Sequence, residues 1–144
     1  MSFAGDLVAY LDSNSTKVTA GSNLFTNLVS ETTGRAVFIV TYGGLPPIDK
    51  FSGTLPAMTQ PRAQVIVRST KPSGGDGIGS STGTENLAFD MWDLCHVANG
   101  TLNSNTYQRL QPLQDPFYLE RDEAGRALFV FNCEAMRAAT TQAA

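Results

Sequence analysis

Apolar and polar residues alternate one by one along residues 62–69, which read RAQVIVRS. Ala63, Val65 and Val67 share one side, and the other side carries mostly polar residues, namely Arg62, Gln64, Ile66 and Arg68. This period-two alternation predicts a β-strand that is buried on one side only. A sheet with one solvated face is usually antiparallel. Pro61 cannot donate a backbone hydrogen bond and therefore suits the first position of this strand.

A helical pattern follows between residues 84 and 99, where apolar side chains recur every three or four positions. The stripe consists of Thr84, Leu87, Ala88, Met91, Trp92, Leu94, Cys95 and Ala98. Such spacing predicts an amphipathic helix, which we expect to pack on the apolar side of the preceding strand. Thr82 or Thr84 is the predicted N-cap, with Glu85 completing a capping box after Thr82. Asn99 and Gly100 are typical of a helix end.

The remaining pattern predicts one more helix and several strands. Residues 2–12 form a short helix capped by Ser2, and residues 35–42 (RAVFIVTY), apolar on both sides, form a central strand. Gly43-Gly44 and Pro46-Pro47 are expected to end that strand. The other predicted segments are a strand at 24–29, an edge strand or loop at 48–54, a connector at 55–60, an edge or bulged strand at 107–113, a hairpin with arms 118–121 and 126–129, and a last strand at 126–134.

This order of helix, strands, helix, strands predicts an α+β fold. We expect a mainly antiparallel sheet with an N-terminal helix and one long helix packed on one face. The length of 144 residues fits one domain. We assign it to residues 1–137 and interpret residues 138–144 as a low-complexity tail.

Composition narrows the possible functions. Charged residues make up 16% of the chain, below the usual ~25%, so a surface covered by partners is favoured. A net charge of −3 argues against a dedicated nucleic-acid-binding protein. We expect no membrane span, because there is no apolar run of about 18 residues, and no signal peptide. Cys95 and Cys133 lie in apolar patterns and are predicted to be buried, reduced thiols.

The glycine-rich stretch at residues 72–83 follows a strand and precedes a helix, as phosphate-binding loops do. Its residues do not match either phosphate motif. Lys71 precedes the glycines, whereas a P-loop lysine follows them, and the alternation of Gly75, Gly77 and Gly79 departs from G-x-G-x-x-G. We interpret the stretch as a surface loop that faces a partner.

The other candidate catalytic and metal-binding residues also lack the arrangement that their chemistry needs. Cys95 and His96 are adjacent, and side chains at adjacent helical positions do not face each other. A usual zinc site needs three or four converging ligands, which these residues do not supply. The carboxylates of Asp115, Glu120, Asp122 and Glu123 are interpreted as turn charges beside Arg121 and Arg126. We therefore predict no catalytic, cofactor-binding or metal-binding residues and no enzymatic activity.

Three stretches in this order carry a family resemblance: RAVFIVTYGGLPP at 35–47, PRAQVIVR at 61–68 and LQDPFYLERDEAGR at 113–126. Together with the N-terminal helix, they resemble the tail terminator, or tail completion, proteins of long-tailed bacteriophages, often labelled minor capsid proteins. The resemblance covers about residues 3–137. The chain departs from it at Pro72–Gly83, where relatives carry a shorter, charged link.

The resemblance implies a structural virion protein that assembles in the bacterial host cytoplasm. Such proteins form a ring, typically hexameric, on the head-proximal end of the tail tube, where they end tube polymerisation and provide the head–tail joining surface. Implied partners are further copies of the chain, the tail tube protein and the neck or connector proteins, and DNA passes through the lumen without specific binding. The alternative reading is another neck, connector or tail tube component. The hypothesised inter-subunit or partner interface consists of Gln64, Arg68, Lys71, Gly75, Gly77, Gly79, Gln108 and Gln111.

Overall fold

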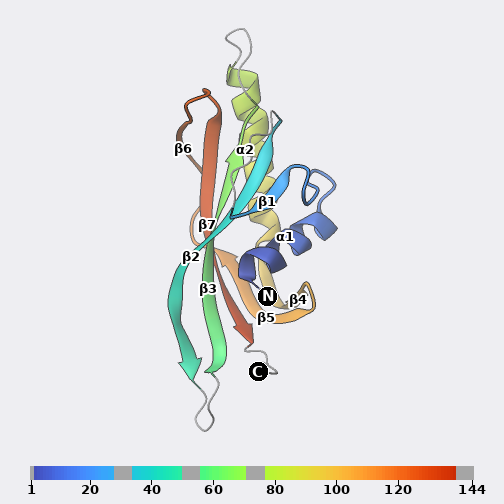
Figure 1. Cartoon of the computed structure of the whole chain (residues 1–144), viewed down its shortest axis with the longest axis vertical. Helices are drawn as coiled ribbons and strands as arrows, with labels where there is room; N and C mark the ends of the chain where they lie inside the picture. Colours follow the sequence, from blue (N-terminus) through green and yellow to red (C-terminus); the bar gives the residue numbers. More distant parts are fainter. Residues whose placement is uncertain (1, 28–33, 50–55, 71–76, 139–144) are drawn as a thin grey trace.

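The computed structural model describes residues 2–27, 34–49, 56–70 and 77–138. This part of the chain has an α+β fold in which two helices accompany a curled, seven-stranded mixed sheet (Figure 1). The elements are α1 (Phe3–Asn14), β1 (Leu24–Thr26), β2 (Ala36–Asp49), β3 (Pro56–Arg68), α2 (Gly77–Leu94), β4 (Val97–Leu102), β5 (Asn105–Pro112), β6 (Phe117–Arg121) and β7 (Ala127–Ala138). The α+β class is confirmed. The division into a domain of residues 1–137 and a tail stays a prediction.

The sheet has the strand order β1-β2-β3-β7-β5-β4, and β6 also pairs with β7. All strand pairs are antiparallel except β1–β2, which is parallel. The prediction of a mainly antiparallel sheet is therefore confirmed, and β1–β2 makes the sheet a mixed one. In this parallel register Leu24 pairs with Val37 and Thr26 pairs with Ile39.

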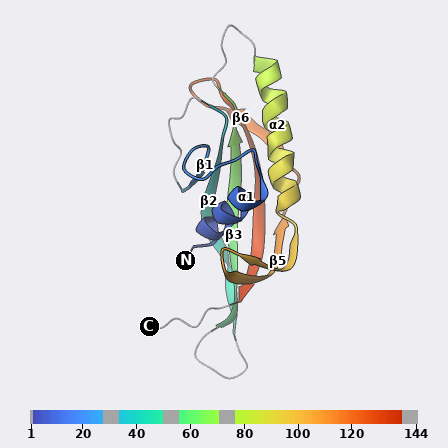
Figure 2. The same ribbon diagram turned by 90° about the vertical axis from the view of Figure 1, so that its right-hand side faces the viewer.

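A single apolar core lies between the sheet and the two helices, which Figure 1 and Figure 2 show beside it. The predicted alternation of β3 is confirmed, since Ala63, Val65 and Val67 are all buried in this core. The facing residues come from both helices and from the neighbouring strands: Phe3, Leu7, Leu11, Val37, Ile39, Leu87, Ala88, Met91, Phe129, Phe131 and Cys133. Cys95 and Cys133 are buried and free, as predicted. Among the described helices, none combines the length and hydropathy that a membrane crossing requires.

Helix α1 is held to the sheet by a buried carboxylate as well as by apolar contacts. Its predicted N-cap is confirmed, because the Ser2 Oγ accepts a hydrogen bond from the Gly5 N–H. One turn later, Asp6 is fully buried and accepts a 2.5 Å hydrogen bond from the Tyr107 hydroxyl of β5. Asn105 Nδ2 donates to both Asp6 oxygens at 3.0 Å, and Arg137 Nη1 lies 3.6 Å from Oδ2. Burial and then the Asp6 contact raise the pKa of Tyr107, which keeps its hydroxyl a donor.

Strand β2 continues past the predicted break at Gly43-Gly44 and Pro46-Pro47. The β2–β3 pairing has register irregularities after Tyr42 and after Leu45, so the chain absorbs these residues as bulges. Among the described residues, β1 pairs with β2 only as far as Ile39, so the rest of β2 is an edge on that side, where proline is tolerated. The predicted connector at 55–60 is therefore wrong, since β3 begins at Pro56 and Pro61 lies within the strand.

The predicted helix overlaps α2, but both of its bounds are wrong. The helix begins at Gly77, inside the stretch interpreted as a loop, and ends at Leu94. Thr84 is therefore not a cap. It is buried within the helix, where its hydroxyl accepts a 3.1 Å hydrogen bond from Arg35 Nε. A Cβ at Gly83 would lie 2.6 Å from Arg35 Nη2, so a larger residue here would have to displace the Arg35 guanidinium from its place beside the helix.

After α2, pairing between strands overrides the helical pattern. Residues Val97–Leu102 form β4, which pairs with β5 through a turn in which Asn103 and Ser104 have positive φ. Asn99 is itself in the left-handed region, at φ 54°. The predicted strand at 107–113 is confirmed as β5, with the expected bulge after Tyr107. It is an inner strand between β4 and β7, so the edge alternative is wrong. The predicted β6–β7 hairpin is confirmed.

Replacing Asp6 with Asn should lower the free energy of unfolding by about 2–3 kcal/mol. The amide cannot accept from Tyr107, Asn105 and Arg137 as the carboxylate does, and it leaves a buried donor unpaired. Urea denaturation followed by circular dichroism measures the change. Asp12→Asn, an exposed carboxylate on the same helix, is the control and should change stability by less than about 0.5 kcal/mol. Equal effects of the two substitutions would contradict the anchoring role.

Candidate functional site

The side of the sheet opposite the core, here called the open face, is the first candidate surface. Register places Val40 and Tyr42 of β2 beside Gln64 and Arg62 of β3, and these in turn beside Asn132 and Glu134 of β7. The described helices pack on the other side, because the residues that β2, β3 and β7 contribute to the core shared with the helices all have odd numbers, whereas these open-face residues have even numbers. This face therefore carries side chains that neither described helix covers.

Charge on the open face is concentrated around Glu134. Arg62 Nη2 lies 3.1 Å from Glu134 Oε2, and Arg109 Nη2 lies 3.4 Å from Oε1. Glu134 is largely buried between them, whereas the side chain of Arg109 is 44% exposed. Two guanidinium groups on one carboxylate leave this cluster with a net charge of +1, so it can accept a further anionic group.

A hollow lies beside this cluster. Its lining consists of Val40, Tyr42, Gln64 and Asn132, and its volume is about 300 Å³. Tyr42 is 41% exposed at its rim. Partial burial raises the pKa of the Tyr42 hydroxyl, and the neighbouring Arg62 charge opposes that shift. The hollow thus has an aromatic and aliphatic wall with two side-chain amides, a lining suited to an apolar side chain rather than to an ion.

The sequence-predicted interface residues are dispersed in the structure. Gln64 lines the hollow, and Gln111 pairs in register with Glu134 on the same face. Gln108 is exposed on β5. Gly77 and Gly79 lie in the first turn of α2 rather than in a loop. Lys71 and Gly75 lie outside the described residues, as does most of the glycine-rich stretch before α2.

Arg68 was predicted to lie at an exposed interface, and this is wrong, because the residue is only 1% exposed. Its guanidinium carbon lies 4.8 Å from the centre of the Phe38 ring, and Phe25 of β1 stacks on Phe38 with centroids 5.7 Å apart. A buried arginine above an aromatic face supplies packing through its stem and a cation–π contact through its head. Arg68 therefore stabilises the β1–β2–β3 region and is not part of the solvent-accessible open face.

A second surface, the β6 edge, was missed by reasoning from the sequence. All five residues of β6 are exposed, including Phe117 (40%), Tyr118 (52%) and Leu119 (48%), and Leu113 just before the strand is exposed too. Among the described strands β6 pairs with β7 alone, and a register irregularity between Tyr118 and Glu120 interrupts its alternation of side chains. The available signal was three consecutive apolar residues in a short strand beside a charged turn.

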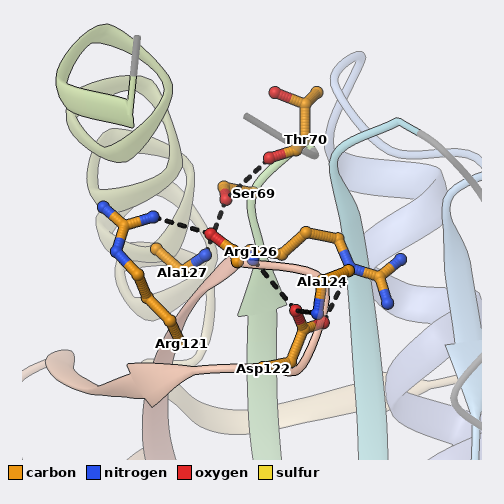
Figure 3. A network of polar contacts seen from close by, with 8 residues as sticks. Ser69, Thr70, Arg121, Asp122, Ala124, Arg126 and Ala127 are labelled. Atoms are coloured by element: carbon orange, nitrogen blue, oxygen red, sulfur yellow. Dashed lines mark hydrogen bonds and ion pairs between the residues drawn. The ribbon is translucent and has the colours of Figure 1, made fainter. Parts of the chain in front are cut away.

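The turn between β6 and β7 holds this edge in place (Figure 3). Asp122 Oδ1 accepts from the N–H groups of Ala124 and Arg126 at 2.9 Å, and Oδ2 accepts from Arg126 Nε at 2.7 Å. Arg121 Nη1 donates to the Gly125 carbonyl at 2.7 Å, and Gly125 has φ +82°. The predicted local pairing of the turn charges is confirmed for Asp122 and Arg126. These contacts make a rigid turn rather than a catalytic carboxylate pair.

His96 lies just beyond the end of α2, which ends at Leu94. It is exposed, and its ring meets the Trp92 ring edge-on at 4.5 Å. Trp92 Nε1 donates to the Gln114 carbonyl, which ties α2 to the segment before β6. Within the described ranges, no group of three or more His, Cys, Asp or Glu side chains is placed to hold a metal ion.

Comparison with known proteins supports the fold. A solved structure of a protein without a functional name matches with a TM-score of 0.55 and 12% sequence identity, covering 98% of this chain and 100% of that chain. No protein-family model and no curated protein matches the sequence. At this identity the likeness establishes the architecture of the whole chain and nothing about its activity.

Arg68→Ala should lower the free energy of unfolding by about 2–4 kcal/mol, because it leaves a cavity beside Phe38 and removes the cation–π contact. Chemical denaturation measures the difference. Gln64→Ala, two positions from Arg68 along the same side of β3, is the matched control, and its free energy of unfolding should lie within about 0.5 kcal/mol of that of the unsubstituted protein. A neutral Arg68→Ala would show that the arginine is not needed for packing.

Acid should weaken the turn through Asp122. Partial burial disfavours its charge, but the hydrogen bonds and charge of Arg126 hold the pKa of Asp122 below its ordinary value. Its stabilising contribution is therefore present above about pH 4 and is lost as pH falls through the lowered folded-state pKa. In urea unfolding between pH 2 and 7, Asp122→Asn should be less stable at neutral pH and converge with the unsubstituted protein in acid. Asp115→Asn, which is exposed, should show no such convergence.

Proposed function

We propose that this protein is a structural subunit of a bacteriophage tail, acting as a tail terminator. Copies of the chain form a closed ring, expected to be hexameric, on the head-proximal end of the tail tube. The ring ends polymerisation of the tube and offers the surface to which the neck or connector proteins join. The protein acts in the virion after assembly in the host cytoplasm.

The observation that carries this proposal is the exposure of large apolar side chains on two different surfaces of one chain. Tyr42 and Leu45 are exposed on β2, whereas Phe117, Tyr118 and Leu119 are exposed on β6, which β3 and β7 separate from β2. Contiguous exposed apolar surface on a small domain is typical of a protein-interaction site. Two unlike surfaces favour a head-to-tail contact, which gives a ring when the rotation between copies closes.

The position of the family-like motifs supports the same function. The stretch PFYLERDEAGR forms the exposed edge β6 and its turn, and PRAQVIVR forms the inner strand β3. A net charge of −3 also suits a conduit, because DNA slides past a surface that does not retain its phosphates. None of these features requires a cofactor or a chemical step.

The proposal predicts a defined oligomer. Native mass spectrometry over a concentration series, with and without tail tubes of the parent phage, should give either one closed ring or a monomer that forms rings on tube ends. Electron microscopy of the same samples should show a ring at one end of each tube. A chain that stays monomeric and ignores tubes would contradict the proposal. Binding along the length of tubes would favour a tube component instead.

A further inference from the structure

The β6 edge presents large apolar side chains that are exposed and held in a fixed orientation. Tyr118 meets the buried Phe129 ring edge-on at 5.7 Å, which fixes its orientation while half of its surface remains exposed. Leu119, at the register irregularity, is 48% exposed. Such side chains on a braced hairpin lose little conformational freedom when a partner covers them, which favours binding.

The hollow on the open face has a lining that suits an apolar side chain from another molecule. Its aromatic and aliphatic wall, Tyr42 and Val40, faces two amides, Gln64 and Asn132. All four residues lie on strands β2, β3 and β7, which are paired on both sides of Gln64. A recess in a paired sheet is present before binding, and its amide groups can satisfy polar backbone or hydroxyl groups of the incoming segment.

The charges around these two surfaces are opposite. The segment around β6 exposes three acids, Asp115, Glu120 and Glu123, against one base, Arg121, a net charge of −2. Asp122 is already paired with Arg126 and adds nothing to this balance. The cluster beside the hollow, Arg62 and Arg109 on Glu134, has a net charge of +1. Opposite charges at the rims of two apolar surfaces steer their encounter and set their register.

Within one chain the β6 edge cannot enter the hollow. Its pairing with β7 fixes β6 opposite Ala127–Val130, whereas the hollow lies farther along β7, at Asn132. We propose that the β6 edge of one copy docks into the hollow on the open face of the next copy, with Glu120 directed toward Arg62 and Arg109. This contact deepens the proposed function and rests on it, since it is the head-to-tail interface of the ring.

Cysteine cross-linking tests the contact in the full chain. Gln64→Cys and Leu119→Cys place one thiol on each surface, and the native cysteines are buried. With a short bismaleimide, a mixture of the two single variants should give covalent dimers, and the double variant should give a ladder that ends at the ring number. Each single variant alone should remain uncross-linked. Asp12→Cys, at an exposed position of α1, replaces Gln64→Cys in the control mixture and should give no dimer.

A second variant measures how much the contact contributes to the affinity between copies. Leu119→Asp should weaken assembly at least about tenfold in the concentration series, as expected for a central apolar contact. Its folding is checked by its circular dichroism spectrum and its urea midpoint. Rings that form without cross-links between positions 64 and 119, or a folded Leu119→Asp that assembles normally, would overturn this interface and leave the proposed function standing. Absence of rings both alone and on tubes would overturn both.

Discussion

The register of β7 is the constraint on which the rest of the structure depends. This strand pairs with β3 on one side and, on the other, with β6 along its first half and β5 along its second half. Phe129, Phe131 and Cys133 thereby face the helices, while Asn132 and Glu134 face the open side. A slip of one residue would exchange the two sets, placing charge in the core. Both the core and the open face are consequences of this one alignment.

The shared edge of β7 also explains why β6 is exposed. β5 ends opposite Cys133, and the chain continues in the same direction along β7 as β6, which begins opposite Val130. The segment between the two strands is held by backbone and amide contacts, since Leu113 donates to the Asn132 carbonyl and Gln114 accepts from the Asn132 N–H. β6 therefore forms a short outer strand whose apolar side chains find no cover in the described part of the chain. A monomer retains such an edge at the risk of aggregation, so its presence favours assembly as the role of the protein.

The sequence pattern predicted helices and strands best where the periodicity of apolar residues matches the side chains that are buried in the fold. The alternation around Val65, the capped helix at Ser2 and the hairpin around Asp122 and Gly125 were predicted correctly because each is determined by near neighbours. The glycine-rich stretch was misread because glycine disfavours helix by about 1 kcal/mol, whereas Arg35, far away in sequence, packs against Gly83. The candidate surface was predicted only in part. Gln64 was placed correctly on the open face, but Arg68 was taken for a surface residue although a neighbouring strand supplies Phe38 beneath it.

By itself, the sequence determined the α+β class, the buried thiols and the alternation of β3, because side-chain period and hydrophobicity are local properties. It also carries the motifs on which the proposed role in a phage tail is based. Only the tertiary structure decided that Asp6 lies in the core beside Tyr107, that β1 runs parallel to β2, and that the β6 edge and the hollow are two separate surfaces. These features depend on contacts between residues far apart in sequence, and such contacts leave no periodic signal along the chain.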